Sequence, residues 1–410
     1  MSGGVEGLRL FEVRLETLTP TIISAEVGYM GFVHKTVADR VPGMVLRGAL
    51  LSEALRSGHL KRDHVDSLAL SPDFALTPLL ALGRRDERDV ELKKLRPLRN
   101  SLVAHSLCFA SKWPEERRIR SPGAHELVNK KLEDLIAHLF ISLTEKVRKG
   151  SLSWASGEVR STESMPTRRV DDEWWLVDTE GWRTAYVQVG LDRPRGSSAP
   201  GVLYAYELTK PGCIYVGLMA VIESSFLMSF LGEKLAGGKI SLTVHIGRGV
   251  SRGFGKVRLT LTELKPGELK AGWLKSELKA NERVVLEATS PIFILNEDLI
   301  PVPPWPGCEL ALDNGWYETL TRQSVSLRLK VVKVYSRRGV TTYRGWSIRT
   351  GKPKMPIRAL PSGSLLVCDV VEGELRSPLA WLLPVLGLNP MASMGFNQLA
   401  PIERDPFGGD

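Results

Sequence analysis

The most constraining feature of the chain is a glycine-rich loop between two segments that alternate apolar and polar residues. The loop runs from Gly247 to Gly255 as Gly-Arg-Gly-Val-Ser-Arg-Gly-Phe-Gly, with four glycines, two arginines and one aromatic residue. Residues 240–246 precede it and residues 256–262 follow it, and their period of two predicts a strand on each side. Glycine allows positive φ and brings backbone N–H groups close to a ligand, arginine binds phosphate, and Phe254 offers a ring face to a base. The loop therefore predicts a nucleic-acid clamp.

Other phosphate-binding loops differ from this one in spacing and context. A P-loop needs Gly-Lys-Ser/Thr at the start of a helix, and a dinucleotide fingerprint needs Gly-x-Gly-x-x-Gly opening a helix after a strand. Here the third glycine, Gly253, stands one residue later than the dinucleotide fingerprint requires, and the chain continues as a strand and not as a helix. A plain glycine-rich hairpin turn is the alternative that stays open. The residues expected to bind RNA are Gly247, Arg248, Gly249, Ser251, Arg252, Gly253, Phe254, Gly255 and Lys256.

Length and composition indicate a globular protein of two or three domains. The chain has 410 residues, of which 43% are hydrophobic and 25% charged. The longest apolar run, 379–388, is interrupted by Pro384 and is too short to cross a bilayer, and no signal peptide precedes the first strand. We therefore expect a cytoplasmic protein without a membrane partner.

The cysteine pattern indicates neither a zinc site nor a disulfide framework. Cys108, Cys213, Cys308 and Cys368 stand far apart with no Cys-x-x-Cys pair, so we expect reduced core residues, no metal and no cofactor. Only three Gln and seven Asn occur beside abundant Arg and Glu, a composition that suits a thermophile.

Positive charge is concentrated in two windows of the sequence. Residues 234–262 contain six Lys or Arg and no acid, and residues 319–368 contain eleven and no acid, within a net charge of +9. Aromatic residues are interleaved in the second window, as expected of a surface for phosphates and unpaired bases. The predicted second RNA surface consists of Arg328, Lys330, Arg337, Arg338, Tyr343, Arg344 and Trp346. A solvated face, or a scaffold whose basic windows bind an acidic protein, is the alternative.

Periodicity predicts an α+β front half, residues 1–264, with the order strand, helix, strands, helix, strand. The predicted elements are a strand over 8–18 with one buried face, a helix after Pro42 that stops at Gly58, an insertion at about 60–125, a helix over 128–143, a strand over 185–191, a hairpin of 202–208 with 213–221, and a helix over 224–235. This order is the split βαβ of a ferredoxin-like domain.

The rear half, residues 273–410, repeats this pattern more loosely. Residues 283–288, 325–335 and 364–371 are predicted strands, and residues 378–386 are a predicted apolar helix. Residues 392–399 then resemble the front glycine loop but lack its arginines and most of its glycines. The Pro/Gly-rich stretch 265–272 is the natural boundary between the halves.

Two motifs together resemble the RAMP (repeat-associated mysterious protein) superfamily of CRISPR-associated proteins. One is Pro42-Gly43-x-x-Leu46-Arg47-Gly48 before a helix, and the other is the loop from Gly247 to Gly255. The tract Gly190-Leu191-Asp192-Arg193, with residues 201–207 after it, is similar to the type III-D subunit that caps the crRNA 5′ handle.

This resemblance implies a non-catalytic RNA-binding subunit of a type III CRISPR effector in antiviral defence, built of two ferredoxin-like (RRM-like) domains. It implies that the chain holds the 5′ handle of crRNA and contacts the large polymerase-domain subunit and a backbone subunit. It also assigns RNA-backbone binding to residues 247–256 and a role as phosphate or loop anchor to Arg47.

A ribonuclease of the same superfamily, for crRNA processing or target cleavage, is the alternative function. Proton transfer at a 2′-hydroxyl would need a group such as His245, beside the loop, or His34. Metal-dependent cleavage would need an acid before the first helix, where Asp39 lies. No partner for these residues is evident in the sequence, so we expect no catalytic and no metal-binding residues.

Overall fold

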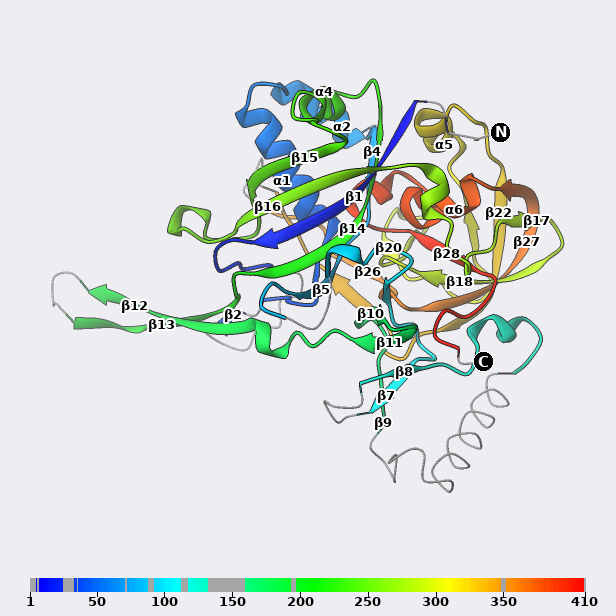
Figure 1. Ribbon diagram of the computed structural model, residues 1–410, viewed down its shortest axis with the longest axis horizontal. Helices are drawn as coiled ribbons and strands as arrows, with labels where there is room; N and C mark the ends of the chain where they lie inside the picture. Colours follow the sequence, from blue (N-terminus) through cyan, green and yellow to red (C-terminus); the bar gives the residue numbers. More distant parts are fainter. Residues whose placement is uncertain are drawn as a thin grey trace.

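The computed structural model describes residues 5, 7–24, 33–34, 36–70, 72–87, 92–111, 117–131, 159–192, 197–347 and 352–408. These residues form a strand-rich α+β structure with few helices, built around two antiparallel sheets (Figure 1). Three-stranded and two-stranded sheets, and one long hairpin, are attached to this body.

The first sheet has seven strands in the order β15-β16-β1-β14-β5-β3, and β4 also pairs with β14. Its strands are β1 (Leu8–Thr17), β3 (Arg40–Val41), β4 (Phe74–Leu76), β5 (Leu79–Arg84), β14 (Cys213–Ile222), β15 (Lys239–His245) and β16 (Lys256–Leu264). Its helices are α1 (Gly43–Arg56), α2 (Arg62–Leu70) and α4 (Phe226–Gly232). Along the chain, β1, α1, β5, β14, α4 and β16 follow one another, and all four strands pair antiparallel in the order β16-β1-β14-β5.

The second sheet has six strands in the order β21-β22-β27-β18-β28, and β17 also pairs with β27. Its strands are β17 (Glu277–Lys279), β18 (Arg283–Ala288), β21 (Glu309–Ala311), β22 (Leu327–Tyr335), β27 (Leu365–Arg376) and β28 (Leu399–Ile402), with helices α5 (Asn314–Thr321) and α6 (Leu379–Leu386). Chain order β18, α5, β22, β27, α6, β28 becomes spatial order β28-β18-β27-β22. The second sheet therefore repeats the strand order of the first.

Smaller sheets surround this body. They contain β6 (Ser101–Val103) with β10 (Pro166–Val170) and β11 (Glu173–Leu176); β7 (Phe109–Ser111) with β8 (Ile119–Arg120) and β9 (Val159–Ser161); β19 (Ile294–Leu295) with β20 (Pro301–Val302); β23 (Thr341–Tyr343) with β26 (Ile357–Ala359); and β24 (Trp346–Ser347) with β25 (Lys352–Pro353). Short 3-10 helices lie at Leu92–Lys94, Ala124–Val128, Glu180–Trp182, Val250–Arg252, Pro266–Leu269 and Pro390–Met394.

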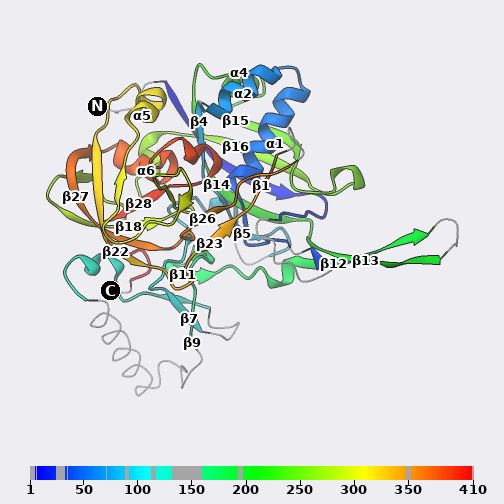
Figure 2. The same cartoon turned by 180° about the vertical axis from the view of Figure 1, so that it is seen from behind.

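A long hairpin extends from the body on the same side as the glycine loop. It consists of β12 (Arg183–Asp192) and β13 (Ser197–Thr209), and β2 (Val33–His34) pairs parallel with β13 near its base. The views from front and back both place this arm beside the loop that joins β15 to β16 (Figures 1 and 2). We refer to β12 and β13 as the arm.

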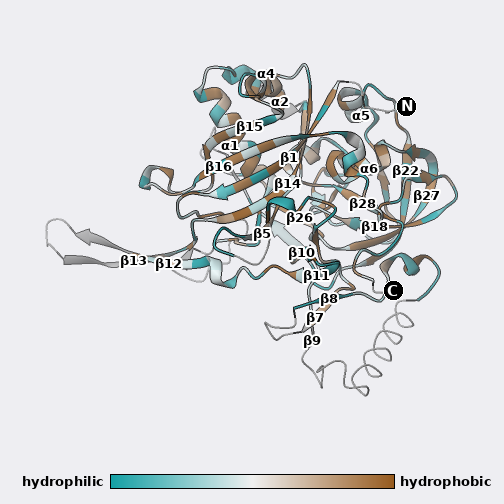
Figure 3. Cartoon of the chain, in the orientation of Figure 1, coloured by the Kyte–Doolittle hydropathy of each residue, from teal (hydrophilic) through white to brown (hydrophobic). Residues whose placement is uncertain are grey.

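Both faces of the first sheet are buried, in two different cores. Phe11, Val13 and Leu15 of β1 pack with residues of α1 and α4, whereas Leu8 and Leu10 belong to a second core that continues into the second sheet and α6. Figure 3 shows apolar residues along β14 and β16 in the middle of the molecule. This second core is therefore shared by the two halves of the chain, whereas the first core belongs to the front half alone.

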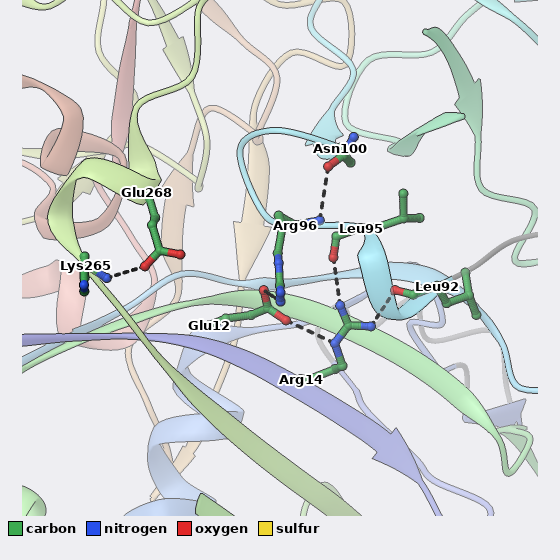
Figure 4. Close-up of polar contacts among 8 residues, drawn as sticks. All are labelled: Glu12, Arg14, Leu92, Leu95, Arg96, Asn100, Lys265 and Glu268. Atoms are coloured by element: carbon green, nitrogen blue, oxygen red, sulfur yellow. Dashed lines mark hydrogen bonds and ion pairs between the residues drawn. The ribbon is translucent and has the colours of Figure 1, made fainter. Parts of the chain in front are cut away.

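The polar side of β1 is covered by the segment that follows β5. Arg14 donates to the carbonyl oxygens of Leu92 and Leu95 at 2.7 and 2.8 Å, and Arg96 pairs with Glu12 at 2.7 Å (Figure 4). Glu12 is only 2% exposed as a result. The prediction that β1 has one buried face was therefore wrong at Glu12, because charged groups from a distant segment neutralise and cover it.

The halves also meet where α1 begins. A Cβ atom on Gly43 would lie 2.7 Å from the Cα atom of Gly395, so only glycine permits this approach. Nearby, the Nε2 of Gln398 donates to the carbonyl oxygens of Leu76 at 2.9 Å and Val385 at 2.6 Å. The rear loop that resembles the glycine loop is thus packed against the front half, and Phe396 is 2% exposed.

Two sequence predictions need correction, and a third falls mostly on residues that the structure does not describe. The strands over 202–208 and 213–221 exist, but they do not form the predicted hairpin, because β13 pairs with β12 and the apolar β14 is buried between β1 and β5. The predicted insertion at about 60–125 begins later than expected, since β4 and β5 pair with β14. The helix predicted over 128–143 lies mostly outside the described residues.

Candidate nucleic-acid interface

The glycine loop lies on the surface between β15 and β16, as its alternating flanks predicted. Arg248, Ser251, Arg252 and Lys256 are exposed, and Phe254 is half-buried. All four loop glycines have positive φ, between 74° and 85°. Among the described residues, the guanidinium of Arg248 has no carboxylate within ion-pair distance, so it is available to an anion.

The glycines serve a different purpose from the predicted one. The amides of Arg248 and Gly255 donate to the carbonyl oxygens of Ile22 at 3.1 Å and Pro20 at 2.9 Å, and the amides of Arg252, Gly253 and Phe254 donate within the loop. A Cβ on Gly247 would lie 1.9 Å from the Ile22 carbonyl oxygen. The expectation that these N–H groups face a ligand was therefore wrong for most of the loop, because its backbone closes on itself and on residues 20–22.

The base of the arm adds aromatic rings beside the loop. Tyr186 lies edge-to-face with Phe254 at a centroid distance of 5.9 Å, and it is 46% exposed. Arg252 donates to the hydroxyl of Tyr206 at 3.1 Å, and its guanidinium carbon is 5.8 Å from the ring centroid. Sequence reasoning missed both tyrosines as site residues. The only signal for them was the tract 201–207, which resembles the type III-D subunit and contains Tyr206.

A cleft of about 550 Å³ continues from the base of the arm between the two halves. Its lining includes four arginines, Arg40, Arg183, Arg338 and Arg344, and three acids, Asp39, Glu180 and Glu207. Arg40 pairs with Asp39 at 2.8 Å and Arg183 with Glu207 at 3.6 Å. Among the described residues, Arg338 and Arg344 have no carboxylate at ion-pair distance. The unpaired positive charge therefore lies on the wall of the cleft that the rear half of the chain forms, beside Tyr343.

Arg47 is an internal anchor and does not face the loop. Its guanidinium donates to the hydroxyl of Ser393 at 2.8 Å and to the carbonyl of Leu68 at 2.9 Å, and it lies 5.5 Å from the centroid of Phe74. Burial lowers the pKa of Arg47 below its ordinary value. Of the two predicted roles, its contacts fit the loop anchor and not the phosphate ligand.

The predicted second RNA surface is divided by the fold. Arg338, Tyr343 and Arg344 line the cleft. Arg337 packs its guanidinium carbon 4.1 Å from the centroid of Phe109, and burial lowers its pKa. Its amide and that of Arg338 both donate to Glu163 at 2.7 Å.

The remaining members of that set do not line the cleft. Arg328 lies near two carboxylates, Glu309 at 3.9 Å and Glu372 at 3.6 Å, and Lys330 is exposed on the same strand. Trp346 lies in β24, and its side chain is outside the described part of the molecule.

The candidate catalytic residues are not brought together. His245 is exposed at the end of β15, Asp39 is paired with Arg40 in the cleft, and the side chain of His34 is outside the described part. Within the described ranges, no three His, Cys, Asp or Glu residues are placed to hold a metal ion. In the same ranges, none of the helices has the length and apolar character needed to cross a bilayer.

Comparisons with known proteins give distant structural likenesses only. No protein-family model matches the chain, and no curated protein matches it. A solved structure of the type III-B complex Cmr-beta bound to cognate target RNA contains a chain with 11% identity and a TM-score of 0.38, which covers 87% of this chain and 86% of that one. Oligomeric Cmr4 from Pyrococcus furiosus has 11% identity and a TM-score of 0.24, over 62% of this chain and 98% of that one.

Proposed function

We propose that this chain is a RAMP-superfamily subunit of a type III CRISPR effector complex, and that it binds RNA along the glycine loop, the base of the arm and the cleft between its halves. The proposal rests on the chemistry of this surface and on the two sequence motifs. Affinity comes mainly from arginine contacts to phosphates, and exposed aromatic rings add stacking with unpaired bases.

The observation that carries the proposal is the continuity of loop and cleft through one strand. Arg183 lines the cleft at the start of β12, and Tyr186, three residues later, contacts Phe254 of the loop. Three residues of an extended strand span about 10 Å. Side chains alternate between the two faces of a strand, so Arg183 and Tyr186 lie on opposite faces of β12, which is the edge strand of its sheet. We propose that a single strand of RNA crosses this edge, and so contacts Arg248 at the loop, Tyr186 at the arm and Arg344 in the cleft.

The finer assignments follow from the same resemblance. We propose that residues 1–264 and 273–410 are two ferredoxin-like domains, a view supported by the shared spatial order of their strands: fourth, first, third, second. We also propose that the RNA is the 5′ handle of crRNA, and that the neighbours in the complex are the large polymerase-domain subunit and a backbone subunit.

We propose that the subunit binds RNA without cutting it. Asp39 forms an ion pair with Arg40. Among the described residues, no acid or base pairs with His245 to direct proton transfer. Incubation of the purified protein with repeat RNA and target RNA, with and without Mg²⁺, tests this. Cleavage that disappears in Asp39→Ala or His245→Ala would establish the ribonuclease alternative instead.

RNA recovery from the purified protein tests the proposed ligand. We expect the preparation to carry nucleic acid, seen as a raised ratio of absorbance at 260 and 280 nm, and sequencing should find a common repeat-derived 5′ tag. A preparation free of nucleic acid that retains an acidic protein would favour the scaffold alternative.

Single substitutions on the RNA-binding surface locate the contact. Arg248→Ala and Arg344→Ala should each weaken binding of the recovered RNA roughly fivefold, as expected for exposed charge pairs of about 1 kcal/mol, and reduce the salt slope by about 0.7 per lost phosphate contact. Arg62→Ala is the matched control, because Arg62 is an exposed arginine on α2, away from this surface. Equal effects of all three variants would show that the RNA binds elsewhere.

A further inference from the structure

A second basic cavity lies at the other end of the molecule, next to the C-terminal residues. Its volume is about 630 Å³, and it is lined by Arg99, β8, the β10–β11 hairpin, residues 272–273 and residues 404–408. None of its lining residues belongs to the glycine loop, the arm or the cleft. Figure 1 places β8 and β11 near the C-terminus and away from the arm. We call this cavity the arginine pocket.

Five arginines line the arginine pocket: Arg99, Arg118, Arg120, Arg169 and Arg404. Two of them are paired, Arg118 with Glu173 at 2.7 Å and Arg169 with Asp172 at 3.1 Å. Arg99 donates only to the carbonyl of Lys270, at 3.3 Å. Within the described residues, Arg120 and Arg404 have no carboxylate at ion-pair distance.

The third acid of the lining, Asp405, is already neutralised from the buried side. Its carboxylate contacts the ring of His105 at 3.1 Å and accepts hydrogen bonds from the hydroxyl of Ser121 at 2.5 Å and the amides of Ala124 at 2.5 Å and Phe407 at 2.8 Å. His105 and Asp405 are both fully buried. The pocket therefore keeps an excess of guanidinium groups that no carboxylate of the described residues offsets.

Aromatic residues form part of the wall of the arginine pocket. Trp174, Trp273 and Phe407 contribute aromatic walls, and their burial fixes the shape of the cavity before any ligand arrives.

Guanidinium groups are well suited to bind phosphate. Their planar forks bind phosphate oxygens in pairs, and a phosphate monoester carries close to two negative charges at neutral pH. A volume of about 630 Å³ lies within the range usual for sites that enclose a small molecule. We propose that the arginine pocket is a binding site for a phosphate monoester or polyphosphate group, presented by a free nucleotide or by the phosphorylated end of an RNA.

Calorimetric titration of the full chain tests the proposal. The probes are inorganic pyrophosphate, ATP, and one oligoribonucleotide prepared with a 5′-phosphate or a 5′-hydroxyl. We expect saturable binding of pyrophosphate or ATP, and an increase in Kd of at least about tenfold in Arg120→Gln/Arg404→Gln, because a charge-assisted hydrogen bond is lost at each position. Arg62→Gln removes the same charge on α2 and should leave the Kd unchanged.

The RNA probes distinguish the source of the phosphate. A 5′-phosphate preference that disappears in Arg120→Gln/Arg404→Gln assigns the pocket to an RNA end, whereas ATP binding without such a preference assigns it to a free nucleotide. Arg404→Gln alone, at an exposed position, provides the test if the double variant unfolds. Absence of binding by every probe, or equal loss of binding in Arg62→Gln, would overturn the proposal.

Discussion

Two glycines of the loop have nearly the same backbone conformation but very different surroundings. Gly247 has φ +74° and Gly253 has φ +85°. A Cβ on Gly247 would lie 1.9 Å from the carbonyl oxygen of Ile22, whereas a Cβ on Gly253 would meet nothing within 4 Å. Substitution by alanine at the two positions therefore separates backbone strain from a steric clash.

The expected free energies follow from this geometry. Alanine in the left-handed region costs about 1–2 kcal/mol at either position. At Gly247 the Ile22 carbonyl must also move, and the hydrogen bond it accepts from the Arg248 amide, 3.1 Å long, is lost at a further cost of about 1 kcal/mol. Gly247→Ala should thus lower the free energy of unfolding by at least about 1 kcal/mol more than Gly253→Ala.

Urea denaturation measures the stability difference, and binding of the recovered RNA measures its effect on the surface. We expect Gly253→Ala to keep the RNA affinity within about twofold, since Arg248 stays in place. Gly247→Ala should weaken RNA binding by a factor similar to that of Arg248→Ala, because the displaced segment carries Arg248. Equal unfolding free energies for the two alanine variants would refute the role assigned to the Ile22 contact.

Three further predictions concern charged groups. Burial raises the pKa of Glu287 to about 8, so between about pH 4.5 and pH 8 the folded state holds a proton that the unfolded state has released. The free energy of unfolding should therefore fall as the pH rises from about 4.5 to about 8. Glu287→Gln should raise the free energy of unfolding by about 3 kcal/mol at pH 7 in urea titrations and should flatten its pH profile. Asp405→Asn leaves the buried His105 without its counter-ion, and we expect a loss of about 3–5 kcal/mol with faster proteolysis of the C-terminal residues, whereas unchanged proteolysis would contradict the anchoring. Arg47→Met should cost about 1–3 kcal/mol by removing the hydrogen bond to Ser393 while RNA affinity is kept, and a selective loss of affinity would restore the phosphate role.

Local periodicity was sufficient to predict the loop and its flanking strands. Residues 240–246 and 256–262 were predicted as strands, and β15 and β16 cover 239–245 and 256–264. The alternation along β15 is complete, with every second residue buried. Such a pattern depends only on which face of one sheet meets the core, so a short stretch of sequence contains it.

Pairing and charge balance could not be predicted in the same way. The more apolar strand β14 occupies the position beside β1 in the first sheet. The strand β13 therefore pairs with β12 and not with β14. The basic windows contain no acids, yet Glu16 pairs with Arg258 at 3.0 Å and Glu372 lies near Arg328 at 3.6 Å. Carboxylates from distant segments thus offset charges that stand alone in the sequence.

The roles of single residues were predicted unevenly for the same reason. Arg248 lies exposed in the loop, where its neighbours in sequence placed it. Arg47 was assigned from a motif, but its hydrogen bonds go to Leu68 and Ser393, which are 21 and 346 residues away in the chain. Tyr186 lies beside Phe254 because β12 of the arm positions it there, and no local pattern in the sequence indicated that contact.

The approach of Gly43 to Gly395 has a consequence for how a ligand enters the cleft. With the backbones in contact and Gln398 bonded to the Leu76 carbonyl, the two halves are held together at this end. We therefore expect a polynucleotide to enter the cleft from its solvent-exposed side, and we expect the distance between the cleft walls to stay the same when it binds.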